Sequence, residues 1–128
     1  MTGDVICLFT VPGQPVPKAR PRWAPRGGTY TAPRTVAAEK RIAEYLKVAY
    51  PHLRPAEGRL GLAVEVYLRG GHQGDADNYL KLVADALNRK AWLDDKQLDR
   101  MYVEVFRECP EPMTRIRVYE IQPAGVLA

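Results

Sequence analysis

The chain contains no serine, only two cysteines and only two histidines among its 128 residues. Without serine a Ser-His-Asp triad is excluded, and neither histidine stands in a recognisable arrangement with Cys7 or Cys109. The cysteines form no CxxC pair, and no second histidine accompanies His72 near the acidic residues that follow it, which argues against zinc. We expect Cys7 and Cys109 to be reduced, buried thiols.

Long hydrophobic runs are also missing. The apolar run Val5–Val11 is far shorter than the roughly 20 residues that a membrane-spanning helix needs. It follows Asp4 rather than basic residues, which is atypical of a signal peptide. We therefore expect a cytoplasmic protein without membrane contact. The length predicts one domain, residues 1–128, that can bury a core without disulfides.

Acidic residues are absent between Asp4 and Glu39, and the net charge of +4 favours an anionic partner. Within this gap, residues 12–34 are rich in proline, which excludes a regular helix or a central strand. The cations of this segment are Lys18, Arg20, Arg22, Arg26 and Arg34, with Trp23 and Tyr30 among them. A solvated linker is one interpretation. A long structureless loop in a small domain tends to be functional, so we predict a loop that contacts DNA phosphates.

Strand and helix patterns alternate along the rest of the chain. Apolar residues predict strands at Val5–Val11 and, by strict alternation, at Leu60–Leu68. Helical spacing predicts a helix over 35–50 with Thr35 as N-cap, and a second over 78–90 with Asp77 as N-cap. Tyr102–Phe106 and Ile116–Ile121 predict an antiparallel hairpin across the proline-containing turn 109–114, and residues 123–128 form a tail.

This order, β-α-β-α-β-β, predicts an α/β (α+β) fold in which two helices cover one face of a small mixed sheet.

The carboxylates gather between residues 74 and 97. Asp75 and Asp77 lie where a strand gives way to a helix, and Asp94 and Asp95 follow that helix. If the chain after the helix folds back, these acids meet at one place, where they would repel one another without a cation. Mg²⁺ prefers such oxygen ligands and takes substrate phosphates as well. Lys81, one turn beyond Asp77, could neutralise a phosphate oxygen.

Structural explanations exist for each acid taken alone. Asp77 and Lys81 can form an i,i+4 ion pair, and Asp94-Asp95 can be a solvated turn. The combination favours a metal site. A calcium EF-hand is excluded because its sixth position is Leu80 rather than Gly and its twelfth is Ala86 rather than Glu.

Two motifs carry a family resemblance. D-A-D-N-Y-L-K-L-V-A-D-A-L-N followed by W-L-D-D-K-Q resembles the signature of RusA-type Holliday-junction resolvases, approximately D-x-D-N-x-x-K-x-x-x-D-A-L and then W-x-D-D-x-Q. The stretch G-Q-P-V-P-K-A-R-P-R is similar to the opening of many phage and prophage members. Together these motifs span Gly13 to Gln97.

The resemblance implies a RusA-like fold and a Mg²⁺-dependent homodimeric endodeoxyribonuclease, with Mn²⁺ as an alternative metal. Such enzymes resolve Holliday junctions by paired symmetric nicks in DNA recombination and repair, in a bacterial or phage setting. Carried over by position, the catalytic residues are Asp75, Asp77, Lys81 and Asp95. The metal ligands are Asp75, Asp77, Asp95 and Asp94. Asp85 matches the motif too, and we expect it to support the structure or to contact the metal ligands.

The chain departs from the family at two places. His72-Gln73-Gly74 stands where some members carry a basic run, and N-R-K-A-W lacks a glycine that the family tolerates before the tryptophan. Two other functions stay open at this point. One is a DNA- or junction-binding protein without catalysis, and the other is a metal-dependent phosphohydrolase acting on a small nucleotide.

Overall fold

The structure is a computed structural model that describes residues 2–19, 22–70 and 74–122. Arg20, His72 and the tail 123–128 therefore lie outside the described residues. The elements follow one another as β1 (Thr2–Pro12), the short strands β2 (Arg22–Trp23) and β3 (Thr29–Tyr30), α1 (Pro33–Ala49), β4 (Leu60–Tyr67), α2 (Ala76–Leu87), the 3-10 turn η1 (Asp95–Gln97), β5 (Leu98–Phe106) and β6 (Met113–Ile121). None of the helices in the described part is long and apolar enough to cross a membrane.

A mixed four-stranded sheet forms the base of the molecule, in the order β1-β6-β4-β5. The pairs β1–β6 and β4–β6 are antiparallel, and β4–β5 is parallel. Strand β4 lies inside the sheet, and its alternate residues Leu60, Leu62, Val64 and Val66 are completely buried. The strict alternation in the sequence thus marks the strand whose side chains form the middle of the core.

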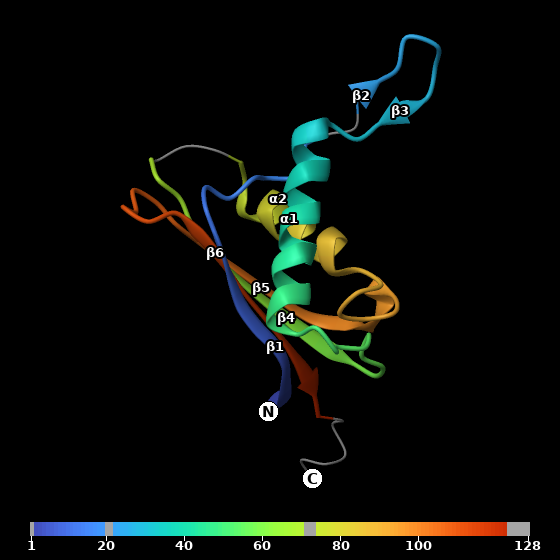
Figure 1. The fold of residues 1–128 in the computed structure, drawn as a ribbon, viewed down its shortest axis with the longest axis vertical. Helices are drawn as coiled ribbons and strands as arrows, with labels where there is room; N and C mark the ends of the chain where they lie inside the picture. Colours follow the sequence, from blue (N-terminus) through green and yellow to red (C-terminus); the bar gives the residue numbers. More distant parts are fainter. Residues whose placement is uncertain (1, 20–21, 71–73, 123–128) are drawn as a thin grey trace.

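Helices α1 and α2 pack side by side on one face of this sheet (Figure 1). Ile42 and Leu46 of α1 and Leu82, Val83 and Leu87 of α2 face the core. The α+β class, the mixed sheet and the two helices predicted from the sequence are therefore confirmed. Both cysteines are free, and Cys7 is buried as expected, whereas Cys109 is only partly buried.

The predicted hairpin of the last two strands is wrong. β5 and β6 do not pair with each other, because β4 lies between them and Tyr67 has both Phe106 and Met113 as neighbours. The link between β5 and β6 crosses the end of β4, where the amide of Cys109 donates to the carbonyl of Leu68. A buried apolar strand such as β4 is more stable with a neighbour on both sides than at an edge.

Both predicted N-caps are wrong as well. Helix α1 begins earlier, with Ala32 as N-cap and Pro33 in its first turn, because the fixed φ of proline suits that position. Thr35 lies inside the helix, 1% exposed, and its hydroxyl accepts from the amide of Ala19 at 3.4 Å. Helix α2 has Asp75 as its N-cap residue, with no side-chain capping bond, and Asp77 stands in its first turn.

The segment 12–34 is partly structured. Strands β2 and β3 form a small antiparallel hairpin, which is joined to α1 and extends beyond the N-terminal end of that helix, away from the sheet (Figure 1). Residues 13–19 form a strap that leads from β1 toward this hairpin, and Pro17 of the strap packs against Gly74. The proline-rich segment therefore combines a strap on the body with a projecting arm.

Candidate active site

Helix α2 positions the first group of candidate residues. The carbonyl of Asp75 accepts from the amide of Asn78 at 2.9 Å, which starts the helix directly after Asp75. Asp77 and Lys81 follow one turn apart, and the Lys81 ammonium lies 3.4 Å from a carboxylate oxygen of Asp77. Both side chains are exposed at 70% and 62% respectively, so this ion pair is open to exchange for a phosphate oxygen.

The chain then turns back after α2. The helix ends at Leu87, and Arg89 takes a left-handed conformation with φ of 68° that reverses the chain direction. Trp92 is completely buried, and its indole Nε1 donates a hydrogen bond of 2.7 Å to Oδ1 of Asp95. This bond orients the Asp95 carboxylate, because its donor sits on a ring that the core holds still.

One surface pocket contains residues from both sides of this turn. It has a volume of about 280 Å³ and is lined by Asp77, Leu80, Lys81, Ala84, Asp85, Asp95, Leu98 and Met101. The structure therefore brings Asp77, Lys81 and Asp95 to one site, as folding back of the chain requires. Asp75 stands at the start of α2 and is not among the residues that line the pocket.

The donor chemistry of this pocket fits a hard divalent cation. Mg²⁺ is usually held by one or two carboxylates, together with waters and substrate phosphates, and Asp77 and Asp95 supply two carboxylates. Within residues 2–19, 22–70 and 74–122, no three His, Cys, Asp or Glu side chains are close enough together to hold a metal by themselves. Substrate phosphate and water would have to complete the coordination.

Asp94 has a different position from its neighbour. Its Oδ1 accepts from the amide of Lys96 at 2.8 Å, and the amide of Asp94 donates to Oε1 of Gln97 in a reciprocal capping box. The Gln97 amide group also donates to the carbonyls of Ala56 and Gly58. The paired aspartates thus divide into one that caps the turn η1 and one that faces the pocket.

The ammonium of Lys18 forms ion pairs with two carboxylates of the protein. It lies 2.7 Å from Glu39 of α1 and 2.9 Å from Asp85 of α2, and the backbone amide of Lys18 donates to the carbonyl of Asn78. Partial burial lowers the pKa of Lys18, but its hydrogen bonds with Glu39 and Asp85 outweigh this, and the pKa is raised above its ordinary value. The sequence showed no sign of these contacts, because their partners are distant along the chain.

The other predicted DNA-binding cations are placed differently. Arg26 belongs to the turn of the β2–β3 hairpin and Arg34 to the first turn of α1, and both are exposed. The side chain of Arg22 is outside the described part of the structure, as is all of Arg20. The exposed members of the set are thus at the arm and at its junction with α1.

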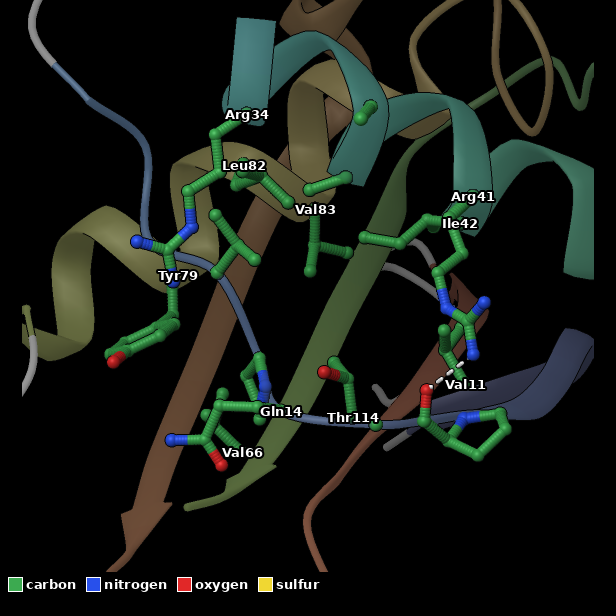
Figure 2. Close-up of a pocket in the computed structure, with 16 residues that line it drawn as sticks. Val11, Gln14, Arg34, Arg41, Ile42, Val66, Tyr79, Leu82, Val83 and Thr114 are labelled. Atoms are coloured by element: carbon green, nitrogen blue, oxygen red, sulfur yellow. Dashed lines mark hydrogen bonds between the residues drawn. The ribbon is translucent and has the colours of Figure 1, made fainter. Parts of the chain in front are cut away.

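A second pocket, of about 250 Å³, lies between the strap and the two helices (Figure 2). Its lining is mostly apolar, with Ile42, Leu82 and Val83 on one side and the guanidinium groups of Arg34 and Arg41 at its margins. The Arg41 guanidinium donates to the carbonyl of Pro12 at 2.8 Å and so fixes the strap. Because no carboxylate lines this pocket, it does not suit metal-dependent hydrolysis.

Comparisons with known proteins indicate the family of the chain. A family model described as endodeoxyribonuclease RusA matches residues 12–119 of the chain. The chain is also 30% identical over 137 residues to the uncharacterized protein YqaN of Bacillus subtilis (strain 168), an alignment that covers 88% of this chain and 95% of that protein. The matched region includes the strap, the arm and all of the candidate acids.

Proposed function

The chain belongs to the RusA endodeoxyribonuclease family, and from this premise we propose that it is a Mg²⁺-dependent Holliday-junction resolvase. It would make paired symmetric nicks across four-way DNA junctions during recombination and repair. The observation that supports this most is the pocket shared by Asp77, Lys81 and Asp95, because two carboxylates and an ammonium group suit phosphodiester hydrolysis. RusA enzymes depend on divalent metals in general, and Mg²⁺ with Mn²⁺ as substitute is the specific proposal.

Each side chain then has a separate task. Asp77 and Asp95 would hold the metal, and Asp75 would add a carboxylate from the start of α2. A divalent cation bound there supplies Lewis-acid stabilisation of the phosphoryl charge and a more acidic water. Lys81 leaves its contact with Asp77 to bind a non-bridging phosphate oxygen. Trp92 holds Asp95 in a fixed orientation through the bond from Nε1.

DNA would lie along the arm and the start of α1. Arg20, Arg22, Arg26 and Arg34 would contact phosphates, which position the junction without reading its sequence. Lys18 supports this surface, since its ammonium is bound between two carboxylates. Asp85 acts with it as a structural residue rather than as a ligand.

The proposed assembly is a homodimer of single-domain chains, each acting as one catalytic unit over residues 1–128. A four-way junction has an approximate two-fold axis, and an isologous dimer places two equivalent pockets about its own axis. Light scattering of the purified protein is expected to give about twice the chain mass of 14.4 kDa. A strict monomer that still makes paired nicks would contradict this assembly.

The test compares a synthetic four-way junction, a Y-fork and a linear duplex, each with Mg²⁺ and with a chelator. We expect the junction to be cleaved with Mg²⁺ and not with the chelator. The variants Asp75→Asn, Asp77→Asn and Asp95→Asn should lose cleavage but still bind the junction. Lys81→Ala should reduce the rate strongly. Asp4→Asn removes the same charge from an exposed site on β1 and serves as the matched control. Full cleavage by Asp95→Asn would refute the proposed site.

Asp94→Asn decides whether the capping aspartate is also a ligand. Asparagine is as good an N-cap as aspartate, so this variant removes the charge while the turn η1 keeps its cap. Cleavage close to the wild-type rate assigns Asp94 to the turn, and a loss as large as that of Asp95→Asn assigns it to the metal.

The alternative function is a DNA-binding protein without catalysis. It would use the same exposed cations, Arg26 of the arm and Arg34 of α1, to contact phosphates. That protein would bind junctions in a salt-dependent way and cleave none of the three substrates at any Mg²⁺ or Mn²⁺ concentration.

A further inference from the structure

The arm presents an exposed tryptophan. Trp23 on β2 is 79% exposed, whereas Trp92, the other tryptophan of the chain, is completely buried. Tyr30 on the paired strand β3 is 46% exposed. Large aromatic side chains normally contribute most of their surface to cores or interfaces, so an indole held in solvent indicates a surface that is covered when a partner binds.

The position of Trp23 is set by a defined backbone. Trp23 pairs with Thr29 across the hairpin, and the amide of Ala24 donates to the carbonyl of Gly28 at 3.0 Å. Gly27 and Gly28 close the turn with φ values of 91° and 78°, which residues with side chains rarely adopt. The indole is therefore displayed on strand β2 of a small folded hairpin, next to a defined turn.

The charge around the arm selects the class of partner. Arg26 is exposed in the turn of the hairpin and Arg34 is exposed in the first turn of α1, and no acidic residue occurs between Asp4 and Glu39. An exposed aromatic ring among cations is how proteins bind unpaired bases, because every base has a flat face for stacking and every nucleotide carries a phosphate. A partner protein with an apolar surface would not need the cations.

The root of the arm lies beside the pocket with the acids. Lys18 contacts Asn78 and Asp85 on α2, and Pro17 packs against Gly74, directly before Asp75. From that root the hairpin extends beyond α1 (Figure 1). DNA that reaches the acids therefore passes the base of the arm, and the branch of a junction, where stacking is interrupted, can come within reach of Trp23.

We infer that Trp23 is a stacking platform for an unstacked base at the branch point of the DNA substrate, with Tyr30 as a second ring on the same hairpin. This inference rests on the proposed function for the identity of the substrate as branched DNA. It adds a means of recognising branched DNA independently of its sequence. The phosphate contacts are the same on any duplex, whereas the stacking contact requires an unstacked base.

Fluorescence of the intact protein in chelator tests the contact without cleavage. Trp23→Phe leaves Trp92 as the only tryptophan, so the difference from wild type reports on Trp23. A four-way junction with 2-aminopurine at the branch should quench Trp23, and a linear duplex with the same probe should not. In the free protein, acrylamide should quench Trp23 readily.

Binding measurements show how much Trp23 contributes to the affinity for the junction. Trp23→Ala should weaken junction binding by about 5- to 150-fold, the range for loss of one stacked base, with little change for linear duplex. Trp23→Phe should recover most of the affinity because its ring still stacks. Val48→Ala, which alters an 82% exposed apolar residue on α1, is the matched control and should bind as wild type.

Two results overturn the inference. If wild type and Trp23→Ala bind the junction with equal affinity, Trp23 makes no stacking contact with it. A Trp23 that is already protected from acrylamide in the free protein would mean that a second copy of the chain covers it. Cleavage by the wild type is scored separately: quenching without cleavage keeps the stacking contact and rejects the nuclease, and cleavage without quenching does the reverse.

Discussion

The ammonium of Lys18 lies 2.9 Å from a carboxylate oxygen of Asp85, and this ion pair joins the strap to the helix that carries the candidate catalytic residues. Glu39 of α1 completes the contact at 2.7 Å. Both helices and the strap therefore meet at one cation. Since the arm continues from the strap, the ion pair fixes the place from which the proposed DNA-binding arm extends.

We predict that Lys18→Met lowers the free energy of unfolding by about 1 kcal/mol, because both ion pairs are partly open to solvent and each is worth less than that. Urea denaturation measures the change. Lys40→Met, an exposed position on α1, removes the same charge and should shift stability by less than about 0.5 kcal/mol. Equal effects of the two variants would show that net charge, not the contact, is responsible.

The pH dependence of this difference follows from the raised pKa of Lys18. The folded chain holds the proton more tightly than the unfolded one, so the stabilisation is fully present below the ordinary lysine value of about 10.4. It is lost as the pH rises through the higher folded pKa. The stability gap between wild type and Lys18→Met should therefore stay constant from pH 6 to 9 and shrink above about pH 10. A gap that grows there would contradict the ion pair.

Trp92→Phe tests the orientation of Asp95. Phenylalanine keeps an aromatic ring in the core but cannot donate to Oδ1, so the carboxylate loses its fixed position. We expect cleavage to fall by about 10- to 100-fold, as for other partners that orient metal ligands. Single-turnover rates at saturating Mg²⁺ measure this, and circular dichroism confirms the fold. Trp92→Phe combined with Asp95→Asn should then be no slower than Asp95→Asn alone.

Local patterns in the sequence predicted the elements well and their neighbours poorly. The alternation in Leu60–Leu68 predicts a strand, and the helical spacing around Leu82 and Val83 predicts a helix. The structure has strand β4 and helix α2 at these positions. The partner of β5 depends on which strand best fills the middle of the sheet, which is a property of the whole core. Alternate residues of β4 are completely buried in the middle of the sheet, and no local feature of β5 or β6 indicates that β4 lies between them.

In the candidate site too, the local geometry could be predicted from the sequence and the long-range contacts could not. Spacing along α2 places Asp77 and Lys81 one turn apart, so their proximity follows from the helix. The return of Asp95 depends on Arg89 adopting a left-handed φ and on burial of Trp92, and the sequence contains neither fact explicitly. The ion pairs of Lys18 with Glu39 and Asp85 could not be predicted locally, because both carboxylates are distant from Lys18 in sequence.

The two thiols should differ in reactivity. Cys7 is completely buried, and burial raises the pKa of its thiol to about 12, although a hydrogen bond with the backbone of Val118 partly opposes this. The thiolate is the reactive form, so Cys7 should react with a thiol reagent at pH 8 only as the protein unfolds. Cys109 is partly exposed and should react in the folded state. Mass spectrometry of a labelling time course separates the two, and rapid labelling of Cys7 would contradict the packing of β1.

Gly74→Ala tests the contact between the strap and the start of α2. A Cβ at this position would lie 2.6 Å from Cβ of Pro17 and 3.0 Å from its Cγ, closer than carbon atoms pack, and the proline ring cannot rotate away. The strap must move, and with it the root of the arm beside Asp75. We expect about a 10-fold loss in kcat/KM on junctions, since small displacements of a binding surface reduce rates strongly. In the Pro17→Gly background the proline ring is gone and the added methyl group keeps only an ordinary contact with Tyr79 at 3.9 Å, so the same substitution should reduce kcat/KM much less there. A loss of the same size in both backgrounds would place its cause in the backbone before α2 and not in the contact between the strap and that helix.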